Sequence, residues 1–172
     1  MTATSVLGAN KAKDTGSRKK GSHPEIFERG LTFVRWVGLA FFILGSTDVA
    51  LTWLPVDFGN REWEFATVTA SFNGMPVIIL GLMLVVVVAA LEARRWWALG
   101  GGIVGLALLV FVLGAIGLWA TNLPLALGAV EGAVLTGLKK AVLKTAVQSV
   151  VLPLVFAAIA YYGFRTFRTA NT

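Results

Sequence analysis

The amino-acid sequence predicts an all-α membrane protein with four transmembrane helices, two short interfacial amphipathic helices and both termini in the cytoplasm. Hydrophobic residues make up 56% of the 172 residues and charged residues 14%, and the mean hydropathy is +0.77. Charges are almost absent from several stretches of about 20 residues, the length that crosses the ~30 Å hydrocarbon core of a bilayer. Basic residues gather at the ends of these stretches, as is typical of membrane topology.

Residues 1–29 are predicted to form a flexible, basic cytoplasmic tail. They are mostly small and polar, with too few large apolar side chains to offset the entropy that ordering would cost. Five Lys or Arg residues lie between positions 11 and 20, before the first apolar segment. The four-helix transmembrane domain is expected to follow over residues 30–168, with a C-terminal tail at 169–172.

Four crossings are expected at about residues 31–54, 75–91, 98–120 and 146–164. Arg35, near the start of the first crossing, is expected to extend toward the lipid headgroups. Arg94 and Arg95 fill the short turn between the second and third crossings, and two more arginines follow the last crossing. Because cytoplasmic loops are enriched in Lys and Arg, these segments and the N-terminal tail are expected on the cytoplasmic side. The expected location is a bacterial cytoplasmic (inner) membrane.

Two short amphipathic helices are expected on the opposite membrane surface, near residues 61–73 and 123–144. Asn60 can cap the first of them, and Glu62 and Glu64 complement the dipole at its N-terminus. In the second, apolar residues recur at helical spacing while three lysines project elsewhere. The sequence leaves open whether this second helix lies on the membrane or dips into it.

Asp48 is the one acidic residue within a predicted crossing, and an ionisable residue inside a membrane is a candidate functional residue. A structural role is favoured, in which Ser46 or Thr47 caps its carboxyl group, or Gln148 or Ser149 of the last crossing forms a hydrogen bond with it. A proton or ion pathway is the alternative, but a single carboxyl group cannot pass protons across ~30 Å of bilayer. Asp48 and Gln148 are therefore predicted to serve helix packing or partner contact.

Gly101 and Gly105 are predicted to let another helix approach the third crossing closely, because they form a small-xxx-small pair. Packing within the chain is favoured over homo-oligomerisation, which stays an open alternative. Basic and indole side chains at the ends of crossings suit contact with lipid headgroups. The residues predicted to make such interfacial or lipid contacts are Trp63, Arg94, Arg95, Trp96 and Trp97.

No catalytic residue, cofactor site or metal site is expected from the sequence. The chain has no Cys and one His, which lies in the polar tail, so thiol chemistry and ligation by paired histidines are excluded. No nucleophile with a neighbouring base is visible in or near a crossing. The net charge of +6 reflects basic residues at the ends of apolar segments and not a face that binds nucleic acid. The expected partners are the lipid bilayer and other membrane proteins.

The stretch from Asp48 to Leu82 carries several short motifs in a recognisable order. They are Leu54-Pro55, Trp63-Glu64-Phe65, Thr67-Val68, Pro76-Val77 and Leu80-Gly81-Leu82. In order and spacing, residues 48–82 resemble the start of HpsJ-like membrane proteins, a family associated in cyanobacteria with exopolysaccharide export and exosortase systems. The segment between the third and fourth crossings departs from that family, because it is short and apolar where the family has a longer, Gln-rich one. The resemblance implies no catalytic residue.

The expected function is that of a non-enzymatic accessory or scaffold subunit of a larger membrane assembly. Glycine-rich and aromatic helix faces are abundant in the sequence, whereas catalytic groups are missing from it. The resemblance implies a link to envelope or exopolysaccharide systems. A small transporter or a lipid-binding membrane protein is one alternative, and an accessory subunit of a photosynthetic or respiratory complex is another.

Overall fold

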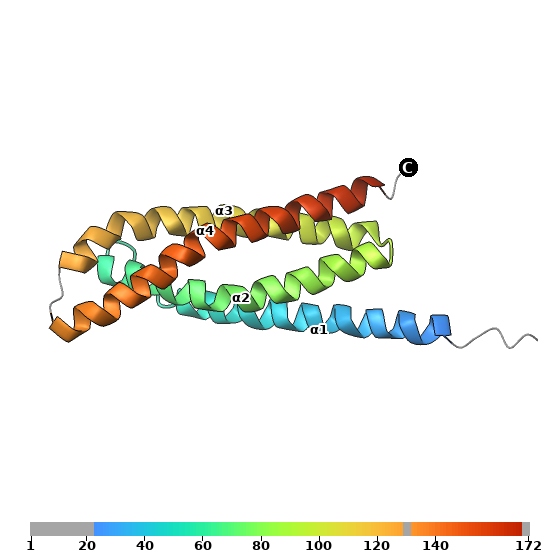
Figure 1. Cartoon of the computed structure of the whole chain (residues 1–172), viewed down its shortest axis with the longest axis horizontal. Coiled ribbons are helices and arrows are strands. Elements are labelled where there is room, and N and C mark those ends of the chain that lie inside the picture. The colour runs from blue at the N-terminus through green and yellow to red at the C-terminus, as the bar shows by residue number, and fades with distance from the viewer. Residues whose placement is uncertain (1–22, 129–131, 170–172) are drawn as a thin grey trace, which may run out of the picture.

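The computed structural model describes residues 23–128 and 132–169, and these residues form four α-helices and no β-strand (Figure 1). The helices are α1 (His23–Thr52), α2 (Arg61–Leu91), α3 (Arg95–Gly128) and α4 (Gly132–Thr169). Each contains a span of 27 to 35 residues that is long and apolar enough to cross a membrane. The described chain is therefore a helical bundle with the features of an integral membrane protein, as the sequence predicts.

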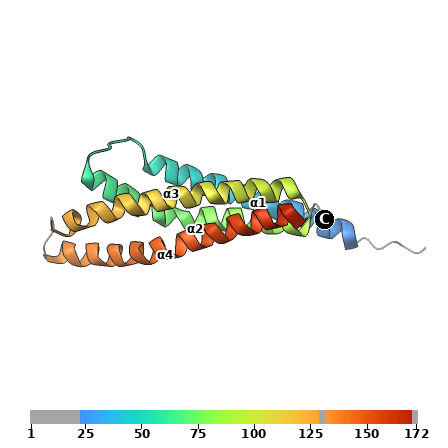
Figure 2. The same ribbon diagram turned by 90° about the horizontal axis from the view of Figure 1, so that it is seen from above.

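The helices run back and forth along one axis, so the chain turns at alternating ends of the bundle (Figures 1 and 2). The turn at residues 92–94, the start of α1 and the end of α4 lie together at what we call the turn end. Residues 53–60 and the start of α2 lie at the opposite end, which we call the loop end. α2 packs along all three other helices, whereas the backbone of α1 packs along α2, and its Arg35 side chain also reaches Trp97 of α3.

The core lies where α2, α3 and α4 meet. Phe72, Met75 and Ile78 of α2 are fully buried there, together with Val112 of α3 and Phe156 of α4. Buried positions on α2 recur at intervals of three and four residues, so one apolar stripe faces the core. Many other large apolar side chains of the described helices point outward, which suits a lipid environment better than water.

Two glycine contacts bring neighbouring helices close together. A Cβ atom added to Gly81 of α2 would lie 2.6 Å from the carbonyl oxygen of Gly38 in α1. One added to Gly163 of α4 would lie 2.7 Å from the Cα atom of Gly102 in α3. No side chain fits at these distances, so the backbones approach in the manner of small-residue helix pairs in membranes.

Residues 61–73 are not the separate surface helix that the sequence predicts but the first part of α2. Asn60 caps this helix, because its Oδ1 accepts a hydrogen bond from the Trp63 N–H at 3.2 Å. The helix continues without a break because its buried stripe runs from Val68 through Phe72 into the apolar span. Pro76 consequently lies in the interior of α2 and not in its first turn.

Residues 123–144 likewise do not form one interfacial helix. α3 continues to Gly128 and α4 begins at Gly132, while residues 129–131 lie outside the described part of the chain. The apolar spacing of this segment continues into both adjoining spans, so both helices are longer than the sequence suggests. α1 already includes residues 23–29 of the predicted tail, whereas residues 1–22 and 170–172 lie outside the description.

Candidate functional site

Asp48 lies on the exposed side of α1, one turn before this helix ends at Thr52. Its carboxylate is close to Gly74 of α2, where an added Cβ atom would lie 3.2 Å from Asp48 Oδ2. No described residue forms a hydrogen bond or an ion pair with this carboxylate. The expected hydrogen bond with Gln148 or Ser149 is wrong, because α1 and α4 make no contact.

The surface around Asp48 is apolar. A shallow depression beside the carboxylate is lined by Ala40, Ile43, Leu44, Thr47 and Leu51, all of which belong to α1. Asp48 is thus a polar group on an outward, largely apolar face, in a helix that packs mainly along α2.

Gln148 contacts α2 instead of α1. Its Nε2 donates a hydrogen bond of 3.2 Å to the backbone carbonyl of Phe72. Pro76 has no N–H, so this carbonyl lacks the partner that a residue four positions later ordinarily provides in a helix. Gln148 of α4 therefore satisfies a backbone acceptor that Pro76 leaves free within an apolar span.

Gly101 and Gly105 are both buried on α3, but they face different helices. A Cβ atom on Gly101 would collide with the Val86 side chain of α2, whereas one on Gly105 would lie 3.1 Å from Ile159 of α4. The backbones of α3 and α4 also approach each other closely at the neighbouring Gly102. The predicted glycine pair is therefore used within the chain.

Glu92 receives two cations at the turn end. Arg35 of α1 donates from Nη1 to Glu92 Oε2, and Arg94 Nε lies 3.0 Å from the same oxygen. Arg35 is 7% exposed, so it does not extend to the headgroups as the sequence suggests. Its guanidinium carbon also lies 5.2 Å from the ring centroid of Trp97. These contacts tie α1 to the turn between α2 and α3.

The remaining residues predicted to contact lipid lie at both ends of the bundle. At the turn end, the Arg95 guanidinium carbon lies 5.4 Å from the Trp96 ring centroid, and the Trp96 and Phe167 ring centroids are 5.9 Å apart. At the loop end, Trp63 packs edge-on against Trp53 with 5.9 Å between ring centroids. Both ends of the bundle therefore carry indole side chains, a residue type that favours membrane interfaces.

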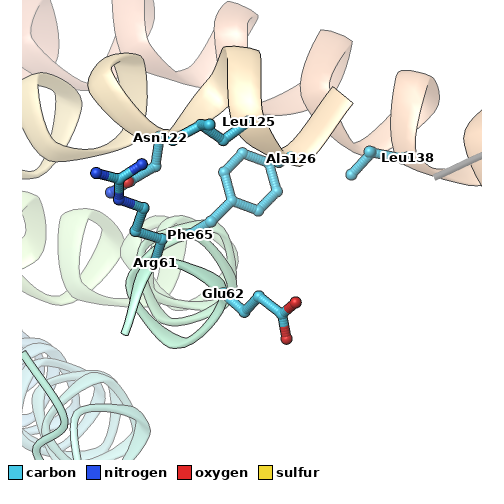
Figure 3. A pocket seen from close by; sticks show the side chains of 7 residues that line it. All are labelled: Arg61, Glu62, Phe65, Asn122, Leu125, Ala126 and Leu138. Atoms are coloured by element: carbon cyan, nitrogen blue, oxygen red, sulfur yellow. The ribbon is translucent and has the colours of Figure 1, made fainter. Parts of the chain in front are cut away.

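A hollow of about 550 Å³ lies at the loop end between α2, α3 and α4 (Figure 3). We call it the loop-end cleft; its lining residues are Arg61, Glu62, Phe65, Asn122, Leu125, Ala126 and Leu138. A second hollow of about 410 Å³ shares Arg61, Asn122 and Leu125 with it. The sequence did not indicate this cleft, because its walls come from three helices that are far apart in the chain.

Asn122 anchors the polar wall of the loop-end cleft. It is 6% exposed and donates from Nδ2 to Glu64 Oε2 at 2.8 Å and to the Leu118 carbonyl at 3.0 Å. The other Glu64 oxygen accepts from the Gly59 N–H at 2.9 Å. No described residue donates to Asn122 Oδ1, which is not among the fully buried polar atoms. The Arg61 side chain forms no hydrogen bond or ion pair with a described residue, although its charge lies near enough to act on Glu64. Polar residues beside apolar segments were visible in the sequence, but a pairing across 58 positions was not.

Metal ligands are not clustered in the described chain: no group of three His, Asp or Glu side chains could hold an ion there. No family model matches the chain, and no curated protein or solved structure matches it either. Two features therefore stand out on geometry alone, the Asp48 face of α1 and the loop-end cleft.

Proposed function

We propose that the chain is a non-enzymatic accessory or scaffold subunit that binds another membrane protein through the outward face of α1. The observation that supports this function is the Asp48 carboxylate, which lies on an apolar helix face without a partner among the described residues. A hydrogen-bond donor on another protein would stabilise this unpaired carboxylate.

A carboxyl group that faces lipid has lost the hydrogen bonds that water provides. Transfer of an unpaired polar group to an apolar environment costs on the order of a few kcal/mol. A partner helix that donates a hydrogen bond to Asp48 removes this cost. Interhelical hydrogen bonds in membranes contribute about 1 kcal/mol. Asp48 would therefore set the register of the partner helix, while the apolar side chains around it provide the contact area.

The rest of α1 offers a large surface for such a partner. Phe33, Trp36 and Phe41 are 69%, 57% and 40% exposed. Aromatic side chains contribute much of the area in helix contacts. Because α1 packs mainly along α2, a partner can approach the opposite side of α1 without displacing another helix of the bundle.

The assembly is proposed to lie in a bacterial cytoplasmic membrane, with the turn end and both termini in the cytoplasm. The arginines at the turn end support this orientation. The resemblance of residues 48–82 to HpsJ-like proteins supports an assembly that serves the envelope or exopolysaccharide export. Asp48 is the first residue of that stretch, so the proposed contact lies in the part of the chain that carries the resemblance.

Purification from native membranes in mild detergent tests this function. The wild-type chain should co-purify with a stoichiometric membrane partner. Asp48→Asn keeps a side chain of similar size that forms hydrogen bonds, so it should retain the partner. Asp48→Ala should lower the recovered partner about fivefold, which corresponds to a hydrogen bond of ~1 kcal/mol. Glu28→Ala removes an exposed acid from the same helix outside the depression and should change nothing.

Two results would contradict the proposal. Equal loss of the partner from Asp48→Asn and Asp48→Ala, with both variants folded, would show that the charge of Asp48 is required and not its hydrogen bond. Recovery of a lone chain that carries proton-coupled flux in liposomes would favour a transporter over a subunit.

A further inference from the structure

We propose that the loop-end cleft binds one phospholipid. Its phosphodiester would contact Arg61, a hydrogen-bond donor of its headgroup would contact Asn122, and one acyl chain would lie along Phe65 and Leu125. This inference goes beyond the accessory role and does not depend on it, because the cleft and the Asp48 face are separate surfaces.

The polar wall of the cleft has a cation and a hydrogen-bond acceptor that are open to a ligand. Arg61 and Asn122 both line the loop-end cleft and the hollow next to it, and their side chains overlap in the view of Figure 3. A guanidinium presents several N–H donors in a plane and suits the oxygens of a phosphate. Asn122 Oδ1 accepts no hydrogen bond from a described residue, and it is not among the fully buried polar atoms, so it opens into the cleft that Asn122 lines. A ligand in the cleft can therefore donate a hydrogen bond to it in place of water.

The apolar wall lies beside these polar groups. The Phe65 ring points toward α3 (Figure 3) and stacks on Trp119 with 6.3 Å between ring centroids. Leu125 is 47% exposed, and Leu138 of α4 lies on the far side of the cleft. A ligand with both a phosphate and a hydrocarbon chain satisfies both walls, whereas a free phosphate leaves the apolar wall in water.

The depth of the cleft also favours a lipid. Trp63 lies two positions after Arg61 and packs against Trp53 at the loop end. Indole side chains gather at the headgroup level of membranes, so Arg61 and Asn122 lie at that level as well. The leaflet at the loop end therefore presents its phosphates at the height of the cleft.

The charges around the cleft determine which phospholipid headgroups fit it. Arg61 supplies one positive charge, while Glu62 and Glu64 lie near it on α2, so a headgroup with extra negative charge is disfavoured. Figure 3 shows Glu62 directed away from Asn122. Phosphatidylethanolamine carries one phosphate and an ammonium that can donate to Asn122 Oδ1. Phosphatidylcholine has the same phosphate but no N–H, so it leaves that acceptor unpaired.

Native mass spectrometry of the full chain tests the headgroup preference. The probe is an equimolar mixture of phosphatidylethanolamine and phosphatidylcholine with identical acyl chains. The wild-type chain should retain about fivefold more phosphatidylethanolamine, as expected for one hydrogen bond of ~1 kcal/mol that phosphatidylcholine cannot form. Arg61→Gln should lower both bound lipids about tenfold, because both carry the phosphate. Arg168→Gln removes an exposed arginine at the turn end and should leave binding unchanged.

A second pair of variants tests the hollow itself. Leu125→Trp should fill the cleft and lower lipid retention about tenfold or more. Leu113→Trp enlarges another leucine of α3, 53% exposed and outside the cleft, and should have no such effect. Glycerophosphoethanolamine has the same headgroup without acyl chains, so it should compete about a hundredfold more weakly than the lipid.

Three results would overturn the proposal. They are equal retention of the two lipids by the wild-type chain, equal effects of Arg61→Gln and Arg168→Gln, and equal effects of Leu125→Trp and Leu113→Trp. Competition by glycerophosphoethanolamine as strong as that of the lipid would identify a soluble phosphate ester as the ligand and would also overturn it. None of these measurements involves a protein partner, so they fail or succeed independently of the Asp48 experiment.

Discussion

Arg35 and Arg94 both contact Glu92, but the two contacts have different surroundings. The side chain of Arg35 is 9% exposed, whereas that of Arg94 is 57% exposed. An exposed ion pair contributes little because water screens it, while a buried charge without a partner is strongly unfavourable. Removal of Glu92 should therefore lower the stability of the protein more than removal of Arg35.

Glu92→Leu should destabilise the protein by about 3–5 kcal/mol, because it leaves Arg35 buried without a carboxylate. Arg35→Met should cost less, since Glu92 keeps Arg94 at 3.0 Å. The double variant should be more stable than Glu92→Leu alone, because neither buried charge is left. Thermal unfolding in detergent measures all three variants. If Arg35→Met lowered the unfolding temperature as much as Glu92→Leu, Arg94 would not compensate Glu92 for the loss of Arg35, and this account of the three charges would be wrong.

Single residues also show what the sequence could and could not reveal. Gln148 was recognisable as a polar residue in an apolar span, but its partner is a carbonyl that Pro76 frees in another helix. Arg35 was recognisable as a charge near a helix end, but its position beside Glu92 depends on how α1 and α2 pack. A sequence shows which side chains need a partner, whereas the partner is set by tertiary contacts.

At the scale of helices, the number and order of the spans could be predicted. A charge-free stretch of ~20 residues has few alternatives to a membrane helix, because every backbone polar group must be satisfied internally. The helix ends could not be predicted. α2 and α3 remain packed at the loop end through Phe65 on Trp119 and Glu64 on Asn122. The same apolar spacing fits a membrane surface and a neighbouring helix equally well.

The contact between α1 and α2 gives a prediction at this scale. An alanine at Gly81 must push α1 away, because its Cβ would lie 2.6 Å from the Gly38 carbonyl oxygen. Gly81→Ala should therefore destabilise the protein by about 1–3 kcal/mol. Gly114→Ala on α3 meets nothing within 4 Å and should be neutral or stabilising by up to about 1 kcal/mol, from helix propensity. Thermal unfolding in the same detergent compares the Gly81→Ala and Gly114→Ala variants. Equal unfolding temperatures for the two variants would contradict the close contact between α1 and α2.

For the whole molecule, the two ends of the bundle carry different charges. The turn end has the basic residues Arg29, Arg35, Arg94, Arg95, Arg165 and Arg168 with the acids Glu25, Glu28 and Glu92. The loop end has Asp57, Glu62 and Glu64 with Arg61 and the lysines of α4. The five basic residues of positions 11–20 precede α1, which starts at the turn end. The lysines of α4 reduce this asymmetry without reversing it, so the turn end is expected in the cytoplasm.

Single cysteines test this orientation cleanly, because the chain has none of its own. Val56→Cys, at the loop end, should react with a membrane-impermeant maleimide added to intact spheroplasts, since Val56 is 56% exposed. Ala93→Cys, exposed in the turn, should react only after the membrane is permeabilised. Labelling of both sites from one side would contradict four crossings. The reverse pattern would keep the bundle but invert it, and it would move the proposed phospholipid to the cytoplasmic leaflet.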